Sequence, residues 1–361
     1  HVNSQITMAT ALVLAVGLGA LPARTFLLGP RAARCPRATL RLDAASATTV
    51  TVRRGPGGLG IDVDSDNLIV DAPGQPDLRA GDVVVAVDGE ALDGRYLGGV
   101  IAPEAEEYSF TVDRDPARSA AALEKALLLL GTDLEAPDVT SIHDQERRDR
   151  VEKVVAALER IAGDVGPKSP AEAEALARGF WKLLLASGGA MEGGASGMAT
   201  SPACSLVAQW QGFSDGEPSA QTVEVIADLD LGRHNVAALK GDLVLEAGSG
   251  SAPAAARETY GRLEVGGSLS SSAVISRGSR WTYLSDQLRV CRPEADPAEG
   301  EAPVFWCYWR TTPEAAQTEI ADLAAAPVAG AADEDEDDMP IWERRAREDR
   351  FYDDDAQSAI P

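Results

Sequence analysis

The sequence is poor in the residues from which common catalytic and metal sites are built. Its 361 residues include only three histidines, His1, His143 and His234, which lie far apart and belong to no spaced metal or triad motif. A Gly-x-Ser-x-Gly elbow, a Walker loop and a dinucleotide-binding fingerprint are also missing. The sequence therefore predicts a protein that is not an enzyme and that uses no metal or cofactor.

Positive charge is scarce as well, with 33 Lys and Arg against 57 Asp and Glu and a formal net charge of -24. Binding to nucleic-acid phosphates requires a basic surface, so this balance excludes nucleic acid as a partner. It also argues against electrostatic docking to an anionic membrane surface. Hydrophobic residues make up 45% and charged residues 25% of the chain, which is typical of a soluble folded protein long enough for two domains.

Cysteine is limited to Cys35, Cys204, Cys291 and Cys307, too few and too scattered for a disulfide framework. Cys291 and Cys307 belong to two neighbouring predicted strands and could face each other across a hairpin. The alternative is a pair of free buried thiols.

The first 48 residues have the composition of a targeting sequence. Residues 9–21 are apolar and of signal-peptide length, and residues 24–41 hold five arginines and no acid, as transit peptides do. A signal followed by a transit peptide resembles the bipartite presequence of algae with secondary plastids, which implies a plastid protein. A simple secretory signal or a short amphipathic anchor is the alternative.

Residues 49–115 are predicted to form a small β domain. Alternating segments flank the glycine-rich run at 55–60, and the pattern Leu-x-x-Gly-Asp-x-x-x-x-Val-x-Gly extends from Leu78 to Gly89. Together these features resemble a PDZ domain. That resemblance implies a groove for the C-terminus of a peptide, with the carboxylate on the loop of Gly58, Leu59, Gly60 and Ile61.

Two further observations bear on such a groove. Asp62 and Asp64 are expected to lie outward along its edge, which favours a basic peptide. Residues 95–102, which would supply the helix beside the groove, contain two adjacent glycines and precede Pro103, so that helix is predicted to be short and weak. The module could instead only pack against its neighbour.

Residues 116–313 are predicted to form a second domain, with helices within 118–187 and a barrel over 203–311. Apolar stripes at helical spacing run through residues 118–131 and 146–162, and a third helix starts at Ser169. Residues 188–201 are rich in Gly, Ala and Met and are expected to form a loop over or beside a barrel mouth. After this loop, short segments of alternating polarity with turn signals between them predict strands at 206–211, 222–226, 237–245, 259–265 and 272–275. Several short strands without intervening helices indicate a barrel or sandwich.

Three blocks of this domain resemble the plastid lipid-associated protein (fibrillin) family. Residues 281–292 read Trp-Thr-Tyr-Leu-Ser-Asp-Gln-Leu-Arg-Val-Cys-Arg, and with the aromatic run at 304–309 they match the closing hairpin of that family. The helix at 151–161 and the Leu-Ala-Arg-Gly-Phe-Trp-Lys-Leu stretch that begins at Leu176 match its entry into the barrel. The resemblance implies a lipocalin-like antiparallel barrel of about eight strands, large enough for one small apolar ligand.

The same blocks supply the predicted ligand site. Trp181, Trp281 and Tyr283 could line a ligand cavity or could simply fill the core. Asp286 and Arg289 could anchor the head group of a ligand at the barrel rim or form an ion pair that holds the hairpin.

The chain ends in an acidic tail, assigned to residues 314–361. Residues 333–355 alone contain twelve acids and four arginines, a composition typical of a disordered segment.

The resulting hypothesis is a plastid protein that binds or carries a hydrophobic small molecule, such as a carotenoid, a prenylquinone or an acyl lipid, at thylakoids or plastoglobules. Association with a membrane or lipid-droplet surface stays open. One alternative is a scaffold or assembly subunit attached to a photosynthetic or lipid-synthesis complex. A weaker one is an enzyme built on the barrel, which requires a titratable pair converging inside it.

Overall fold

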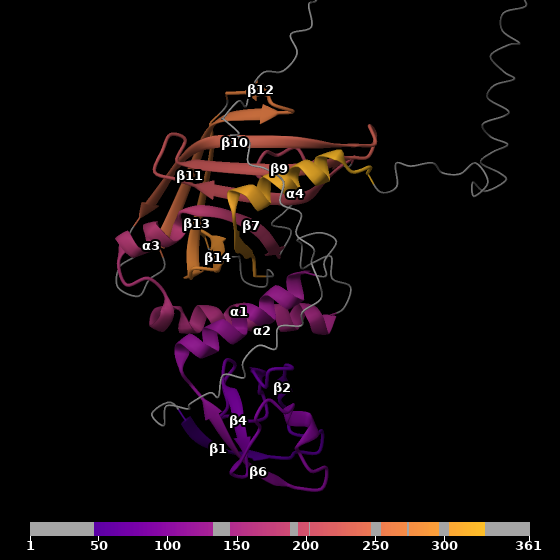
Figure 1. Ribbon diagram of the computed structural model, residues 1–361, viewed down its shortest axis with the longest axis vertical. Coiled ribbons are helices and arrows are strands. Elements are labelled where there is room, and N and C mark those ends of the chain that lie inside the picture. Colours follow the sequence, from indigo (N-terminus) through magenta and orange to yellow (C-terminus); the bar gives the residue numbers. More distant parts are fainter. Residues whose placement is uncertain are drawn as a thin grey trace, which may run out of the picture. The chain divides into compact units, whose positions relative to one another are not determined.

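A computed structural model describes residues 47–132, 145–187, 194–201, 203–246, 254–272, 274–295 and 303–328. Within these ranges the chain is mainly β with four helices, and eight of its strands close into an antiparallel barrel (Figure 1). The predicted barrel with helices is thus confirmed. The predicted presequence, apart from its last two residues, and the acidic segment 333–355 lie outside the described residues.

The N-terminal module is built on a four-stranded sheet in the order β1-β6-β4-β5. These strands span Ala47–Arg53, Glu107–Asp113, Val83–Val87 and Glu90–Ala91. A separate hairpin pairs β2 (Asp62–Val63) with β3 (Ile69–Asp71). Val52, Phe110 and Val112 alternate with exposed or half-buried residues and form the centre of the module core. The predicted β domain is present, and its membership of the PDZ family stays a prediction.

Two helices follow, α1 (Pro116–Thr132) and α2 (Gln145–Val165). The carboxylate of Asp115 accepts hydrogen bonds from the amides of Ala117 and Arg118, so the predicted cap of α1 is confirmed. The apolar stripes of both helices are buried in one cluster with Leu68 and Val70 of the N-terminal module and with residues from the outer face of the barrel. The module, the helix pair and the barrel therefore share a hydrophobic core.

The barrel strands follow the order β10-β9-β8-β7-β15-β14-β13-β11, and pairing of β10 with β11 closes the ring. They span Gly179–Ala186 (β7), Cys204–Phe213 (β8), Ala220–Asp228 (β9), Arg233–Glu246 (β10), Ala254–Val265 (β11), Ile275–Leu284 (β13), Leu288–Pro293 (β14) and Trp306–Thr311 (β15). The barrel thus begins at β7, before the predicted start at 203. The short strand β12 (Ser268–Ser271) pairs with β11 outside the ring. The predicted strand at 272–275 is wrong, because Ser272 and Val274 lie between β12 and β13, which begins at Ile275.

The stretch 281–292, interpreted from the sequence as one strand, is a hairpin. β13 ends at Leu284 and β14 begins at Leu288, and the Ser285 hydroxyl accepts hydrogen bonds from the amides of Gln287 and Leu288. A local side-chain acceptor of this kind stabilises a tight turn. The expected pairing with the next strand is confirmed, since β14 pairs antiparallel with β15.

Two further helices border the barrel. Ser169 caps α3 (Pro170–Ala177) as predicted, with its hydroxyl accepting from the amide of Glu172. The helix α4 (Pro313–Ala325) was not predicted, because its residues were assigned to the acidic tail. It lies along the outer side of β9 and β10 (Figure 1), where Ala316 packs in a cluster with Trp210 and Val225. The tail therefore cannot start at 314.

Candidate ligand site inside the barrel

Arg289 occupies the interior of the barrel. On β14, Leu288 and Val290 face the core shared with the helices, whereas Arg289 and Cys291 face inward, as the two-residue period of a strand requires. The exposed fraction of Arg289 is 0%. The prediction that Arg289 lies at the barrel rim or pairs with Asp286 is therefore wrong; the structure makes it the centre of the interior.

Four aromatic rings surround the Arg289 guanidinium. Its Cζ lies 5.1 Å from the ring centre of Trp181, 4.9 Å from those of Phe213 and Trp281, and 4.4 Å from that of Tyr308. Because the faces of aromatic rings carry negative potential, this arrangement stabilises a cation without water. The predicted interior positions of Trp181 and Trp281 are confirmed, and both tryptophans belong to the interior cluster. We call these four rings and Arg289 the aromatic cage.

The hydrogen-bonding capacity of Arg289 is only partly used. Its Nη2 donates to Oε1 of Gln211. No oxygen or nitrogen of the described residues accepts a hydrogen bond from Nε or Nη1. A buried donor without a partner costs about 1 to 3 kcal/mol, and more for a charged group, so such a group calls for an explanation such as a bound water or ligand. These two nitrogens are the strongest indication of a binding site in the described chain.

A first chain of hydrogen bonds runs from Arg289 across the interior. Gln211, which accepts from Arg289, donates to the two carboxylate oxygens of Glu258 at 3.4 and 3.2 Å. Tyr260 donates to Glu258 at 2.5 Å, and its hydroxyl lies 2.6 Å from that of Thr222. Burial raises the pKa of Tyr260 well above its usual value, and the neighbouring Glu258 raises it further. Tyr260 is therefore a neutral donor at physiological pH.

A second chain runs from the cage toward one end of the barrel. Tyr308 donates to Gln209 at 3.0 Å, and Gln209 donates to Glu224 at 2.7 Å. Glu224 is fully buried and also accepts from the backbone amides of Ala195 and Ser196 and from the Ser196 hydroxyl. Its carboxylate is thus saturated by four donors, which is how a buried charge is tolerated.

The Glu224 carboxylate holds the loop 194–196 against the barrel interior. Ala195 packs in the interior cluster, and Arg277 donates to the carbonyl oxygen of Gly194 at 2.8 Å. Gly194 has φ +61°, and a Cβ there would lie 2.7 Å from Oε1 of Glu224, so only glycine fits. The predicted position of this loop beside the barrel mouth agrees with residues 194–196; residues 188–193 lie outside the described chain.

The other end of the barrel is closed by Arg310 and α3. The guanidinium of Arg310 lies 4.2 Å from the ring centre of Trp181 and donates to the backbone carbonyls of Leu176, Arg178 and Asp286. Burial lowers the pKa of Arg310, and the nearby Asp286 opposes that change. Asp286 therefore contributes a carbonyl oxygen and a nearby charge at this end, rather than the predicted anchor for a head group.

Tyr283 does not line the interior. A bulge between Trp281 and Tyr283 inserts Thr282 against β14, so Trp281 faces inward while Tyr283 faces the shared core. The Tyr283 hydroxyl donates to Glu124 of α1 at 2.6 Å. The prediction that Tyr283 could line the ligand cavity beside Trp281 is wrong, because the bulge turns Tyr283 to the other face of the strand.

The two cysteines of the closing strands also face opposite ways. Cys291 belongs to the interior cluster and Cys307 to the shared core, and both are free. Burial raises the pKa of Cys291 to about 12, against the lowering effect of the nearby Arg289. Of the two alternatives, free buried thiols are confirmed.

Sequence reasoning missed Gln211, Glu224, Glu258, Tyr260 and Tyr308, which complete the interior. A signal was present, because Glu258 and Tyr260 are two residues apart and so share one face of β11. The interior contains a titratable pair, Glu258 and Tyr260, which no histidine motif indicates.

The loop predicted to bind a peptide carboxylate contains two glycines with positive φ. Gly58 and Gly60 have φ of 105° and 62°, and no described residue accepts from the amides of Leu59, Gly60 and Ile61. The helix expected beside it is a single 3-10 turn at Leu97–Gly99, as short as predicted.

The acids at the predicted groove edge are engaged within the chain. The carboxylate of Asp62 lies 3.5 Å from Arg150 of α2. The carboxylate of Asp64 accepts from the amides of Asp66 and Leu68 at 2.9 Å each. Both acids therefore have partners within the chain, and the preference for a basic peptide stays a prediction.

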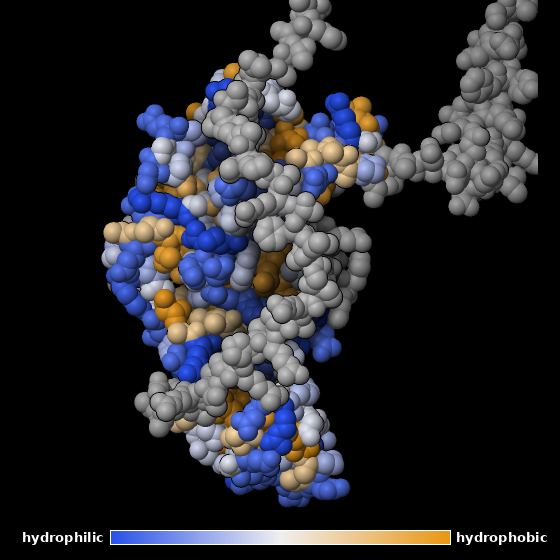
Figure 2. Space-filling model, viewed as in Figure 1, coloured by the Kyte–Doolittle hydropathy of each residue, from blue (hydrophilic) through white to orange (hydrophobic). Residues whose placement is uncertain are grey.

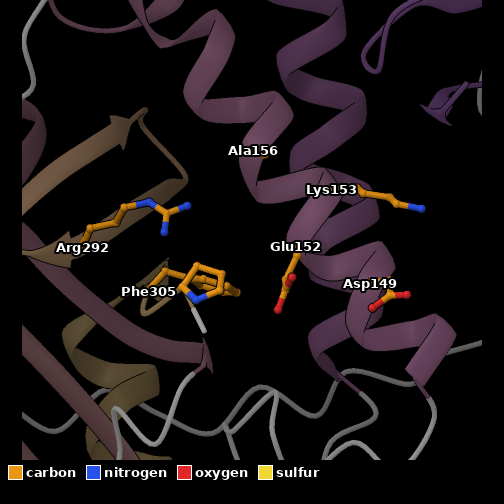
Figure 3. Close-up of a pocket in the computed structure, with 7 residues that line it drawn as sticks. Asp149, Glu152, Lys153, Ala156, Arg292 and Phe305 are labelled. Carbon is orange, nitrogen blue, oxygen red and sulfur yellow. The ribbon is translucent and has the colours of Figure 1, made fainter. Parts of the chain in front are cut away.

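A separate hollow of about 320 Å³ lies between α2 and the barrel. Glu152 from α2 points into it, facing Arg292 and Phe305 of the barrel, whereas Lys153 and Asp149 point away (Figure 3). Burial raises the pKa of Glu152, and Asp149 adds to the rise. Because Arg292 is already paired with Glu159 at 2.6 Å, this hollow is a weaker candidate than the aromatic cage.

Comparison with known proteins identified no relative of this chain. The described residues contain no group of acids, histidines and cysteines placed to hold a metal ion, and none of their helices is long and apolar enough to cross a membrane. The fibrillin resemblance therefore rests on the sequence blocks alone and stays a prediction. Searches of protein-family models, of curated proteins and of solved structures found no match to this chain.

Proposed function

We propose that this protein binds a hydrophobic small molecule inside its barrel, with a polar end of the ligand at Arg289. The observation that carries the proposal is a fully buried guanidinium within four aromatic rings, whose Nε and Nη1 have no oxygen or nitrogen acceptor among the described residues. A ligand acceptor at Nε or Nη1 removes the penalty of the unmade hydrogen bonds. The rings offer a flat apolar surface for the adjoining part of the ligand.

The polar interior narrows the ligand classes expected from the sequence. Burial of an apolar body stabilises a complex by roughly 25 cal/mol per Å², and any of the three classes could supply that area. A pure hydrocarbon carotenoid leaves Nε and Nη1 unpartnered, whereas a prenylquinone or an acyl lipid brings an oxygen acceptor. The proposal therefore favours an oxygen-bearing ligand, carried at thylakoids or plastoglobules.

The outer surface is consistent with a carrier that works in water. On the face shown in Figure 2, hydrophilic residues predominate and apolar residues lie in small patches between them. Exposed apolar side chains such as Leu229, Leu231, Leu269 and Val274 lie near turns of the barrel strands. Scattered exposure of this kind needs no explanation by a partner.

The test is mass spectrometry of organic extracts from protein purified out of its native source. A stoichiometric lipid, quinone or pigment is expected in the wild type and is expected to fall away in Trp281→Ala. The matched control is Trp210→Ala, which removes an equally buried tryptophan from the outer cluster beneath α4. Extracts free of any ligand in the wild type contradict the proposal.

A second candidate function is peptide binding at the N-terminal module. It is favoured by the amides of Leu59, Gly60 and Ile61, which have no acceptor among the described residues, and it makes the protein a scaffold. Fluorescence polarisation with a library of peptides tests it by comparing each free C-terminus with its amidated form. Equal binding of both forms, or of neither, leaves the module with a packing role against α2, which the Asp62–Arg150 and Asp71–Lys153 pairs already support.

A further inference from the structure

The charges that face the barrel interior already balance. Arg289 and Glu258 are joined through Gln211. Arg277 lies directly opposite Glu258 on the neighbouring strand, and residues opposite each other in a ladder share one face of the sheet. Glu224 is a further interior acid. Around the aromatic cage the described residues thus supply two guanidiniums and two carboxylates, and Asp228 at the end of β9 lies opposite Arg233 in the ladder.

Two further charged groups lie at the end of the barrel next to α3. Arg310 lies beyond Trp181 and bonds to backbone carbonyls, and Asp286, whose charge opposes the lowering of the Arg310 pKa, lies close to it. This pair is also formally balanced. A ligand that reaches the aromatic cage therefore meets no surplus positive charge.

The Glu258 carboxylate already accepts hydrogen bonds from neighbouring side chains. Both of its oxygens accept from the Gln211 amide, and one also accepts from Tyr260. The Gln211 amide is oriented so that its oxygen faces Arg289 and its nitrogen faces Glu258. Glu258 thereby neutralises Arg289 without occupying Nε or Nη1, which leaves two donors for a ligand but no net charge.

From this balance we infer that the barrel selects a ligand with a neutral hydrogen-bond acceptor, such as a ketone, quinone or ester carbonyl, and rejects a free carboxylate. The inference rests on the proposed function, because it names the head group of that ligand. A neutral carbonyl satisfies Nε or Nη1 and adds no charge. A carboxylate adds an unmatched negative charge to a buried site, where charges without partners are strongly disfavoured.

The experiment compares matched acid and methyl-ester pairs on the full chain at pH 8, where the free acids are ionised. The pairs are palmitic acid and methyl palmitate, and retinoic acid and methyl retinoate, with binding measured by tryptophan fluorescence. In the wild type we expect each ester to bind at least ten-fold more tightly than its acid, which is about 1.4 kcal/mol. This comparison needs no variant and so does not depend on the folding of one.

The variant Glu258→Gln tests the cause of the selectivity. It keeps the size of the side chain and removes one negative charge, which leaves the interior with a net positive charge. We expect the preference for the ester to fall by at least ten-fold or to invert. The control Glu217→Gln, at an exposed position on the same barrel, is expected to keep the wild-type preference.

The outcomes separate the two claims. Tighter binding of the acids by the wild type, or an unchanged preference in a folded Glu258→Gln variant, overturns the inference and leaves the proposed function in place. Binding of no member of either pair, together with ligand-free organic extracts of the native protein, overturns both.

Discussion

Replacement of Glu224 by glutamine is the sharpest test of how the interior is held together. The carboxylate accepts from two backbone amides, the Ser196 hydroxyl and the Gln209 amide. A carboxamide has one acceptor oxygen and one NH₂ group, so it can accept only the hydrogen bonds that one of the two carboxylate oxygens now accepts. If its oxygen keeps the Ala195 and Gln209 donors, its nitrogen faces the amide of Ser196, which then loses its partner.

The magnitude follows from counting these donors. One buried amide left without an acceptor costs about 1 to 3 kcal/mol. The bonds that remain change from charge-assisted to neutral, which weakens each by roughly half. We therefore expect Glu224→Gln to lower the free energy of unfolding by about 2 to 4 kcal/mol. Hydrogen exchange at the amides of Ala195 and Ser196 is expected to accelerate.

The assay is urea denaturation monitored by fluorescence, beside hydrogen exchange resolved to residues 194–196. Glu217→Gln is the control, because Glu217 is exposed on a loop of the same barrel. A change in stability within about 0.5 kcal/mol of that control, with unchanged exchange at 195 and 196, would falsify the reasoning that Glu224 anchors the loop.

Two further predictions concern the contact between α2 and the barrel and the buried thiols. Glu159→Gln is expected to cost about 1 to 3 kcal/mol of unfolding free energy, because the half-buried carboxylate accepts two hydrogen bonds from Arg292, at 2.6 and 2.8 Å; calorimetry that shows no fall in melting temperature contradicts it. Since the pKa of Cys291 is raised to about 12, this thiol stays protonated at pH 8, with roughly one thiolate in ten thousand molecules. Iodoacetamide is therefore expected to label Cys204, which is partly exposed, and to spare Cys291 until the protein unfolds; equal labelling of both thiols in the folded protein is the contrary result.

Elements defined by local patterns could be predicted from the sequence. The apolar stripes of α1 and α2, the caps at Asp115 and Ser169, and most barrel strands depend on neighbours a few residues away. The segment of α4 lacked such a signal, because its residues Pro313–Ala325 are rich in alanine and border an acidic tail. Its helical state is stabilised by packing on the barrel, which only the folded chain shows.

The interior site could be predicted only in part. Trp181 and Trp281 were identified because large aromatics alternate with polar residues in strands. The role of Arg289 depends on Gln211, which precedes it by 78 residues, so no local pattern could relate the two. The position of Tyr283 depends on a bulge, and one extra residue changes the face of everything beyond it.

That extra residue affects how related chains must be compared with this one. Thr282 has no opposite residue in the ladder, and its hydroxyl donates a hydrogen bond to Glu159. As an extra residue in β13, it decides which of its neighbours face the barrel interior and which face the shared core. Without Thr282, Tyr283 directly follows Trp281 and still faces Val290 on the outer side, so replacement and deletion of Thr282 both leave Trp281 inside and Tyr283 outside. An alignment with a strand that lacks the bulge therefore keeps the two faces matched only if it places a one-residue gap at Thr282, whereas an ungapped alignment compares inward with outward residues on one side of Thr282.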